Sequence, residues 1–268
     1  MSLFNFSHEE LLTFFAVLVR FGTLVAVLPV VGDKMVPVPA KVLFALAVSF
    51  ALYPALTSSG QVRPGDAAVW GATTGGIVST VALEAVFGLV LGYTAKLLFD
   101  AIEVGANISG QFMGFSMATA YDPMQESQTL VVSQLQGALA MLLFLSLDGH
   151  HLMLRSSLES YSIVGLGAAG FGQVFGNNLV EMTGQVLRFG LQLAAPVAIA
   201  MFAVQVAFAV VAKAVPQMNI LILSFSISAM VGIFAMWVSV PEVQSVSGNV
   251  LERMDEWLKL AAQSMAGR

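Results

Sequence analysis

The sequence predicts an all-α membrane protein with about six long hydrophobic helices arranged in hairpins. Of its 268 residues, 57% are hydrophobic and only 10% are charged, and the mean hydropathy is +0.85. A soluble domain carries about 25% charged residues, so lipid or partner subunits must cover much of this surface. The apolar runs are long and continuous, as between Lys41 and Arg63. This pattern favours helices over the short alternating segments of a β-barrel.

The first helix is expected to begin at a capping box. Ser7 and Glu10 have the S-x-x-E spacing directly before an apolar run, so Ser7 is predicted to be the N-cap. The first charged residues are acidic, whereas a signal peptide needs a basic start. We therefore expect a retained first span near Leu11–Val31, interrupted only by Arg20.

The remaining spans are placed by the distance between successive charged residues, and turn chemistry separates them. The expected runs are Lys41–Arg63, Ala67–Leu98 with Glu84 inside it, Glu126–Asp148, the glycine-rich Glu159–Glu181, Arg188–Lys213 and Lys213–Glu242. Breaks are predicted at Pro29–Pro39, Pro54–Asp66, Asp122-Pro123, Asp148-Gly149, Gly165–Asn178, Pro216 and Pro241. No linker is long enough to divide the chain, so residues 1–268 are predicted to form one domain.

Two further helical features follow from local patterns. The tail Val243–Met265 mixes apolar and charged residues as an amphipathic helix does, which suits an interface or a water-facing end. Gly88 and Gly92 have the G-x-x-x-G spacing that lets two helix backbones approach closely, so tight packing is expected there.

Lys96, Asp100 and Glu103 are spaced to share one face of a helix. Ionisable groups beside apolar helices are costly unless they are paired or hydrated. The three residues are therefore predicted either to be buried or pore- or partner-facing charges, or to lie at a helix end that reaches the lipid headgroups.

No catalytic, cofactor or metal site is predicted. The chain has no cysteine, and its net charge of −5 without a basic stripe argues against nucleic-acid binding. His150 and His151 are adjacent, and neighbouring side chains on a helix point about 100° apart, which argues against a shared metal ion. The chain is therefore expected not to be an enzyme.

The most unusual stretch is Gly105–Met124, which is apolar and rich in glycine, methionine and aromatic residues. Three glycines within ten residues disfavour a regular helix. Methionine side chains are flexible and adapt to many shapes, which suits a surface that must seal and reopen. An ordinary glycine-rich packing helix is the alternative.

At this stretch the sequence resembles the FliR family, known as SctT in the injectisome branch. The resemblance covers nearly the whole chain in order. Its core blocks are G-L-V-L-G-Y at Gly88–Tyr93, G-Q-F-M-G-F-S-M-A-T-A-Y-D-P at Gly110–Pro123 and L-A-M-L-L-F-L-S-L-D-G-H at Leu139–His150. The outer blocks are R-F-G-T-L-V-A-V-L-P at Arg20–Pro29, V-P-V-P-A-K-V at Val36–Val42 and A-V-P-Q-M-N-I at Ala214–Ile220.

The resemblance implies a core subunit of a type III protein export gate. In this family one such subunit assembles with FliP-like and FliQ-like subunits, and an FlhB-like subunit joins them. The implied place is the bacterial inner membrane at the flagellar basal body, in contact with lipid and with unfolded flagellar export substrates. The segment A-V-P-Q-M-N favours the flagellar branch; the alternatives are an injectisome homologue and, on composition alone, a small ion or solute transporter.

The resemblance also implies a plug that seals the closed gate. By position the plug corresponds to Gly110–Asp122, called the gate segment below. We expect this segment to be non-helical or broken and to project into the central path. The implied gate residues are Gly110, Phe112, Met113, Gly114, Phe115, Met117, Tyr121 and Asp122.

Overall fold

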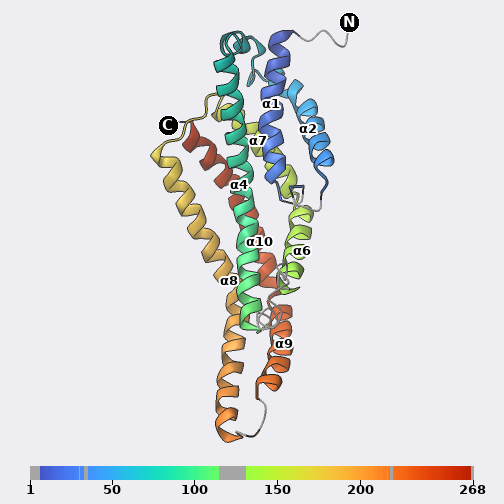
Figure 1. Ribbon diagram of the computed structural model, residues 1–268, viewed down its shortest axis with the longest axis vertical. Coiled ribbons are helices and arrows are strands. Elements are labelled where there is room, and N and C mark those ends of the chain that lie inside the picture. The colour runs from blue at the N-terminus through green and yellow to red at the C-terminus, as the bar shows by residue number, and fades with distance from the viewer. Residues whose placement is uncertain are drawn as a thin grey trace. The chain divides into compact units, whose positions relative to one another are not determined.

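The computed structural model describes residues 7–29, 31–32, 36–114, 131–215, 217 and 220–266. Every regular element in this described part is helical, which confirms the predicted all-α class (Figure 1). The elements are α1 (His8–Val27), α2 (Val38–Ser58), the 3-10 turn η1 (Pro64–Asp66), α3 (Ala67–Trp70), α4 (Thr74–Phe112), α6 (Val131–Ser146), α7 (Gly149–Ile163), α8 (Gln173–Ala214), α9 (Ile220–Val238) and α10 (Val240–Met265).

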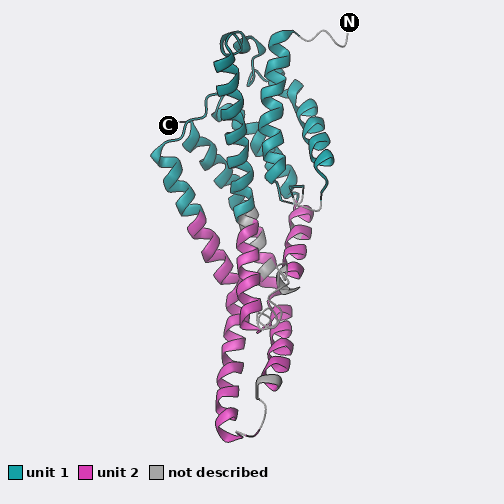
Figure 2. Cartoon of the chain, in the orientation of Figure 1, with its two compact units in different colours: residues 1–97, 148–182, 252–268 teal, residues 98–147, 183–251 magenta. Residues whose placement is uncertain are grey.

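The chain divides into two compact units, which Figure 2 colours separately. Unit 1 comprises residues 1–97, 148–182 and 252–268, and unit 2 comprises residues 98–147 and 183–251. Three helices, α4, α8 and α10, have residues in both units. Residues of one unit contact one another more than they contact the other unit. This division does not test the expectation of a single domain, which stays a prediction.

The capping box at the start of α1 is confirmed. The Ser7 hydroxyl accepts a hydrogen bond from the Glu10 backbone N–H at 3.1 Å, and the Glu10 carboxylate accepts one from the Ser7 N–H at 2.8 Å. Beyond the cap, α1 pairs with α2, and the Tyr53 hydroxyl donates to the Glu10 carbonyl at 3.2 Å. These contacts fix the first hairpin of unit 1.

In the described residues, four helices are long and apolar enough to cross a membrane, namely α1, α2, α4 and α8. The helices α6 and α7 are bent by 62° at a short break, and together they pass the same test as one further span. Asp148 lies at that break in the left-handed region, with φ 56°, so the predicted Asp148-Gly149 break is confirmed. Residues 223–238 of α9 form a shorter apolar helix. The architecture is that of an all-α membrane protein.

Helix α8 is much longer than the sequence predicted, and α4 both begins and ends later than predicted. Helix α4 has 39 residues and α8 has 42, where spans at Ala67–Leu98 and Arg188–Lys213 were expected. Helix α8 already begins at Gln173, so the loop expected at Gly165–Asn178 is shorter than predicted. The difference arises because charged residues were taken as span ends, whereas Glu and Arg are good helix formers and a helix continues through them.

The C-terminal helix is amphipathic, as expected. In unit 1 its apolar residues Met254, Trp257 and Leu258 are buried. At the edge of this contact, the Ser156 hydroxyl of α7 donates to Asp255 at 3.0 Å, and Lys259 donates to Asp255 at 2.7 Å. Burial alone would raise the pKa of the Asp255 carboxyl, but the hydrogen bonds from Lys259 and Ser156 outweigh it and lower the pKa below its usual value.

Candidate functional site

The described part of the gate segment begins inside a helix. Gly110 and Phe112 belong to α4, which ends immediately afterwards. Of the two expectations for Gly110–Asp122, a non-helical or a broken segment, the non-helical one is therefore wrong for the first three residues. Close packing explains the difference, because Gly105 faces Gly190 and Leu193 of α8 at distances that leave no room for a side chain. That contact offsets the roughly 1 kcal/mol by which a glycine disfavours a helix.

The break itself falls at Gly114. The Met113 N–H donates to the Ser109 carbonyl at 3.1 Å, and the Gly114 N–H donates to the Gln111 carbonyl at 3.0 Å. Gly114 has φ 84°, the left-handed conformation in which helices commonly end and which glycine adopts without strain. The other predicted gate residues, Phe115, Met117, Tyr121 and Asp122, lie outside the described residues.

Among the gate residues that the structure describes, Met113 is a fully buried one. Its side chain is 0% exposed and belongs to an apolar cluster with Val197 and Met201 of α8. Gly232 of α9 lies against the same side chain. In Figure 1, α8 and α9 run side by side through this part of unit 2. The start of the gate segment is therefore held between these two helices, while Phe112 is exposed.

The charged row on α4 is not buried in the chain by itself. Lys96 and Glu103 are exposed, and Asp100 is half-buried. The buried face of α4 is made instead by small and apolar residues such as Ala95, Ala101 and Ala106. The described residues thus leave Lys96 and Glu103 exposed, and a buried, pore-facing or partner-facing role for the row in an assembly stays a prediction.

Two charged residues are fully buried and form an ion pair with each other. In the sequence they stand out only because they interrupt predicted apolar spans. Arg20 of α1 and Glu84 of α4 have side chains that are 0% exposed. The guanidinium donates twice to the carboxylate, from Nε at 2.5 Å and from Nη2 at 2.9 Å. This fork geometry is the strong form of an ion pair. We call Arg20, Glu84 and the groups that bind them the charged node.

The charged node also holds the loop between α7 and α8. The Gly167 N–H donates to Glu84 at 2.7 Å, and Arg20 donates to the Ser160 hydroxyl at 3.2 Å and to the Val164 carbonyl at 3.4 Å. The Tyr161 ring lies 3.7 Å from the guanidinium carbon, within the range of a cation–π contact. Three segments of unit 1 therefore meet at one ion pair: α1, α4 and the stretch from the end of α7 into the following loop.

The predicted close packing at Gly88 and Gly92 is confirmed. A side chain at Gly88 would collide with the Arg20 carbonyl and the Thr23 hydroxyl of α1, and one at Gly92 would lie 3.1 Å from the Leu24 carbonyl. The two glycines let α1 and α4 approach closely, which brings Arg20 within reach of Glu84.

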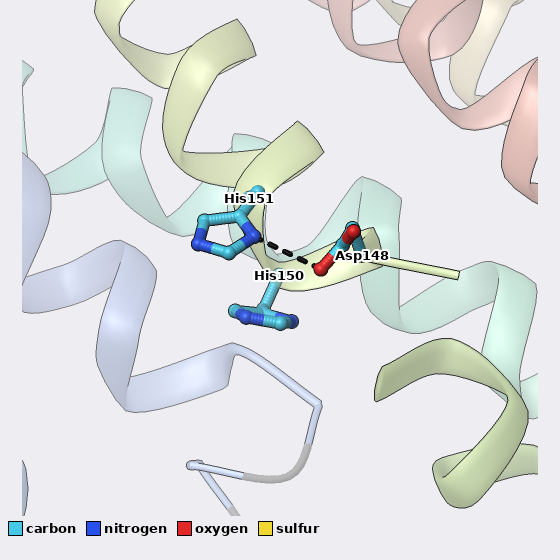
Figure 3. A group of neighbouring side chains, drawn as sticks. All are labelled: Asp148, His150 and His151. Atoms are coloured by element: carbon cyan, nitrogen blue, oxygen red, sulfur yellow. Dashed lines mark hydrogen bonds and ion pairs between the residues drawn. The ribbon is translucent and has the colours of Figure 1, made fainter. Parts of the chain in front are cut away.

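Asp148, His150 and His151 come closer together than the sequence argument allowed (Figure 3). Their ligand atoms all lie within 4.8 Å of one another, and the two imidazole rings are 4.2 Å apart. Neighbouring side chains leave a helix about 100° apart, but the imidazole rings of His150 and His151 still approach each other, with an interplanar angle of 36°. The group shows one hydrogen bond among its members, of 3.1 Å between His151 Nδ1 and Asp148.

The fold and these sites define a polytopic helical membrane protein. One unit contains the buried charged node, and the other contains a buried methionine, Met113, that packs against Gly232. The family model described as bacterial export proteins, family 1, matches residues 11–254, and the chain belongs to this family.

Its relatives are mostly flagellar. The flagellar biosynthetic protein FliR of Escherichia coli K12 is 25% identical over 85% of this chain and 84% of its own length. FliR of Bacillus subtilis 168 is 25% identical over 94% and 96% of the two chains. The Yop proteins translocation protein T of Yersinia pestis is 26% identical over 83% of each. The resemblance to the FliR/SctT family is thereby confirmed.

Proposed function

We propose that the chain is a FliR-like core subunit of the flagellar type III protein export gate. It assembles with FliP-like and FliQ-like subunits, and an FlhB-like subunit joins them. Together they form the entry channel for unfolded export substrates in the inner membrane at the flagellar basal body. The role is structural and gating, with no catalytic step.

The observation that carries this proposal is the length of exposed apolar surface on α8. At 1.5 Å per residue α8 is about 63 Å long, whereas the hydrocarbon core of a bilayer is about 30 Å thick. Exposed hydrophobic side chains nevertheless follow the helix almost from end to end. They are Val174, Val180, Leu187, Leu191, Ile199, Phe202, Val206, Val210 and Val211. Lipid covers at most about half of such a helix, so protein neighbours must cover the rest.

The flagellar branch is favoured by the relatives and by the segment 214–220. The Yersinia relative keeps the injectisome branch as the alternative. Deleting the gene separates the two, because loss of motility with normal secretion of effector proteins supports the flagellar assignment. The opposite pattern supports the injectisome.

Within the gate, the segment Gly110–Asp122 acts as the plug. Helix α4, in which the segment begins, ends at Phe112, Gly114 takes the left-handed conformation, and the aromatic and methionine side chains of the segment offer a largely apolar surface. The row Lys96, Asp100 and Glu103, exposed or half-exposed in the chain alone, then faces a partner or the export path.

Co-purification tests the assembly. A tagged chain extracted in mild detergent should bring out small membrane partners in fixed stoichiometry and should aggregate when expressed without them. A monodisperse and folded chain without partners would instead support a transporter that works alone.

Ion leakage tests the plug. Deleting Phe115–Met117 should raise ion conductance across the membrane of cells while the assembled complex still forms. Replacing Met113 and Met117 with alanine should do so more weakly. The matched control is deletion of Gln125–Ser127, outside the gate segment. Unchanged conductance in correctly assembled complexes would show that Gly110–Asp122 is packing and not a plug.

A further inference from the structure

We propose that Asp148, His150 and His151, at the start of α7, bind a divalent transition-metal ion of the zinc class. The three residues belong to unit 1 and lie outside the gate segment. The proposal goes beyond the export function proposed above and does not depend on it. It revises the expectation from the sequence, in which two adjacent histidines argued against a shared ion.

The three side chains bring their ligand atoms to one place. One such atom from each residue lies within 4.8 Å of the other two, and Asp148 Oδ1 is 3.1 Å from His151 Nδ1. Two atoms that bind one zinc ion at about 2.1 Å and at the tetrahedral angle lie about 3.4 Å apart. The first pair therefore already has the spacing of two ligands, and the third lies within the reach of a side-chain rotation.

The Asp148 carboxylate is turned toward the histidines. Asp148 is the one non-glycine residue with a positive φ in the part of the chain that the structure describes. It is the N-cap residue of α7, a position where an aspartate side chain usually accepts a hydrogen bond from a backbone N–H of the first turn. The Asp148 side chain makes no such bond, and its Oδ1 faces the His151 ring instead (Figure 3).

The kinds of ligand atom select the class of ion. Calcium and magnesium ions prefer oxygen ligands throughout, whereas imidazole nitrogens suit zinc and its neighbours among the transition metals. Two histidines with one carboxylate form a known zinc-binding set, in which water completes the tetrahedron. The group therefore favours zinc or a similar ion over calcium and magnesium.

The group is accessible, as a reversible metal site must be. The side chains of Asp148 and His151 are 74% and 70% exposed, and His150 is half-buried. An ion therefore has a path of entry to at least two of its ligands. Once bound, it would hold the left-handed Asp148 and the first turn of α7 in one geometry.

The first test measures whether zinc covers the two histidines. The full chain in isolated membranes is stripped of metal with a chelator, washed, and treated with diethyl pyrocarbonate, which modifies accessible imidazoles. The treatment is made with and without added zinc, and mass spectrometry reads each histidine separately. His8, the third histidine of the chain, is exposed at the start of α1 and serves as the internal reference.

We expect zinc to slow the modification of His150 and His151 several-fold and to leave that of His8 unchanged. Unchanged modification of all three would overturn the proposal. Equal slowing of all three would also overturn it, because zinc would then act on the reagent or on the whole chain. Magnesium at the same concentration should protect none of them, and equal protection by magnesium would overturn the choice of a transition metal.

The second test measures zinc content in variants of the full chain. The chain carries a tag without histidines, is purified in detergent with any subunits that accompany it, and is dialysed against micromolar zinc. Asp148→Asn is the most informative variant, because asparagine tolerates the left-handed backbone as aspartate does but lacks the carboxylate that zinc binds. His8→Gln is the matched control, since it removes a histidine outside the group.

Asp148→Asn and His151→Gln should each bind zinc at least about tenfold more weakly, since loss of a second-shell group alone costs about 10–100-fold. His8→Gln should bind as the unaltered chain does. Unchanged zinc affinity in both site variants would overturn the proposal. If a variant does not accumulate, the protection measured on the unaltered chain still decides the question.

Discussion

At the centre of unit 1, a guanidinium and a carboxylate are fully buried, whereas the cluster in unit 2 is made of Met113, Val197 and Met201. The charged node links α1, α4 and the stretch from the end of α7 into the following loop by hydrogen bonds of fixed direction, so any displacement leaves a charge without a partner. The methionine cluster has no directional bond and tolerates rearrangement. From this contrast we expect the surroundings of the charged node in unit 1 to hold one arrangement more firmly than the surroundings of Met113 in unit 2.

The largest effect is expected at the charged node. Arg20→Met leaves Glu84 charged and buried, which costs about 3–5 kcal/mol of folding free energy. The amount of chain in the membrane and its resistance to protease should both fall sharply. The control is Arg155→Met, because the Arg155 side chain is 77% exposed and its ion pair with Glu159 joins residues of the same helix at i,i+4.

The double variant Arg20→Met with Glu84→Met sharpens this test. It removes both charges, so it should recover most of the lost protein. If Arg20→Met alone behaves like Arg155→Met, the node does not stabilise unit 1 and the contrast between the units fails.

The stability of the methionine cluster should depend on the volume of the side chain at position 201 and not on its chemical nature. Met201→Ala leaves a cavity beside Met113 and should destabilise unit 2 by about 2–5 kcal/mol, as buried Met→Ala changes do. Met201→Leu keeps the volume and should cost less than about 1.5 kcal/mol. Thermal denaturation of the purified complex measures both. Equal losses for the two variants would show that Met201 is needed for more than filling space.

A smaller effect is expected from the charged row on α4. Lys96→Ala should impair export or assembly more than Lys259→Ala. Lys96 shares its helix face with Asp100 and Glu103, which a partner or the export path would cover, whereas Lys259 lies among solvated charges of α7 and α10. Secretion of an export substrate measures the difference. Equal and negligible effects would show that Lys96 only reaches the headgroups.

The smallest effect is expected from Asp255, and it depends on pH. Its pKa is lowered in the folded chain, so its contribution to stability is present above the unfolded pKa of about 3.9 and is lost as the pH falls through the folded value. Proteolysis of the C-terminal helix should therefore accelerate on acidification below about pH 4. In Asp255→Asn this acceleration should be weaker; an identical pH profile would show that other carboxyl groups control the loosening.

Local signals in the sequence identified local structure correctly. The spacing of Ser7 and Glu10 predicted the first N-cap, and Asp148-Gly149 predicted the break between α6 and α7. Gly88 and Gly92 predicted a close helix contact. Each of these signals depends either on residues that are close in sequence or on the absence of a side chain. It can therefore be recognised in a single sequence.

Long-range pairing was not predictable in the same way. Arg20 and Glu84 are 64 residues apart, and a single sequence does not indicate which distant charges meet. The continuation of α4 through Gly105 depends on Gly190 of α8, and the burial of Met113 depends on Gly232 of α9. In each case the missing information was the identity of the packing partner. The charges inside apolar spans were nevertheless a usable signal, because such charges are costly unless paired.

The length of α8 has a consequence for biogenesis. The machinery that inserts membrane proteins handles apolar segments of about 20 residues, and α8 with its 42 residues offers room for two of them end to end. A single continuous helix can form only where one half leaves the lipid and finds a protein surface. If partner subunits supply that surface, as proposed above, we expect their supply during synthesis to influence whether a newly made chain is kept or degraded.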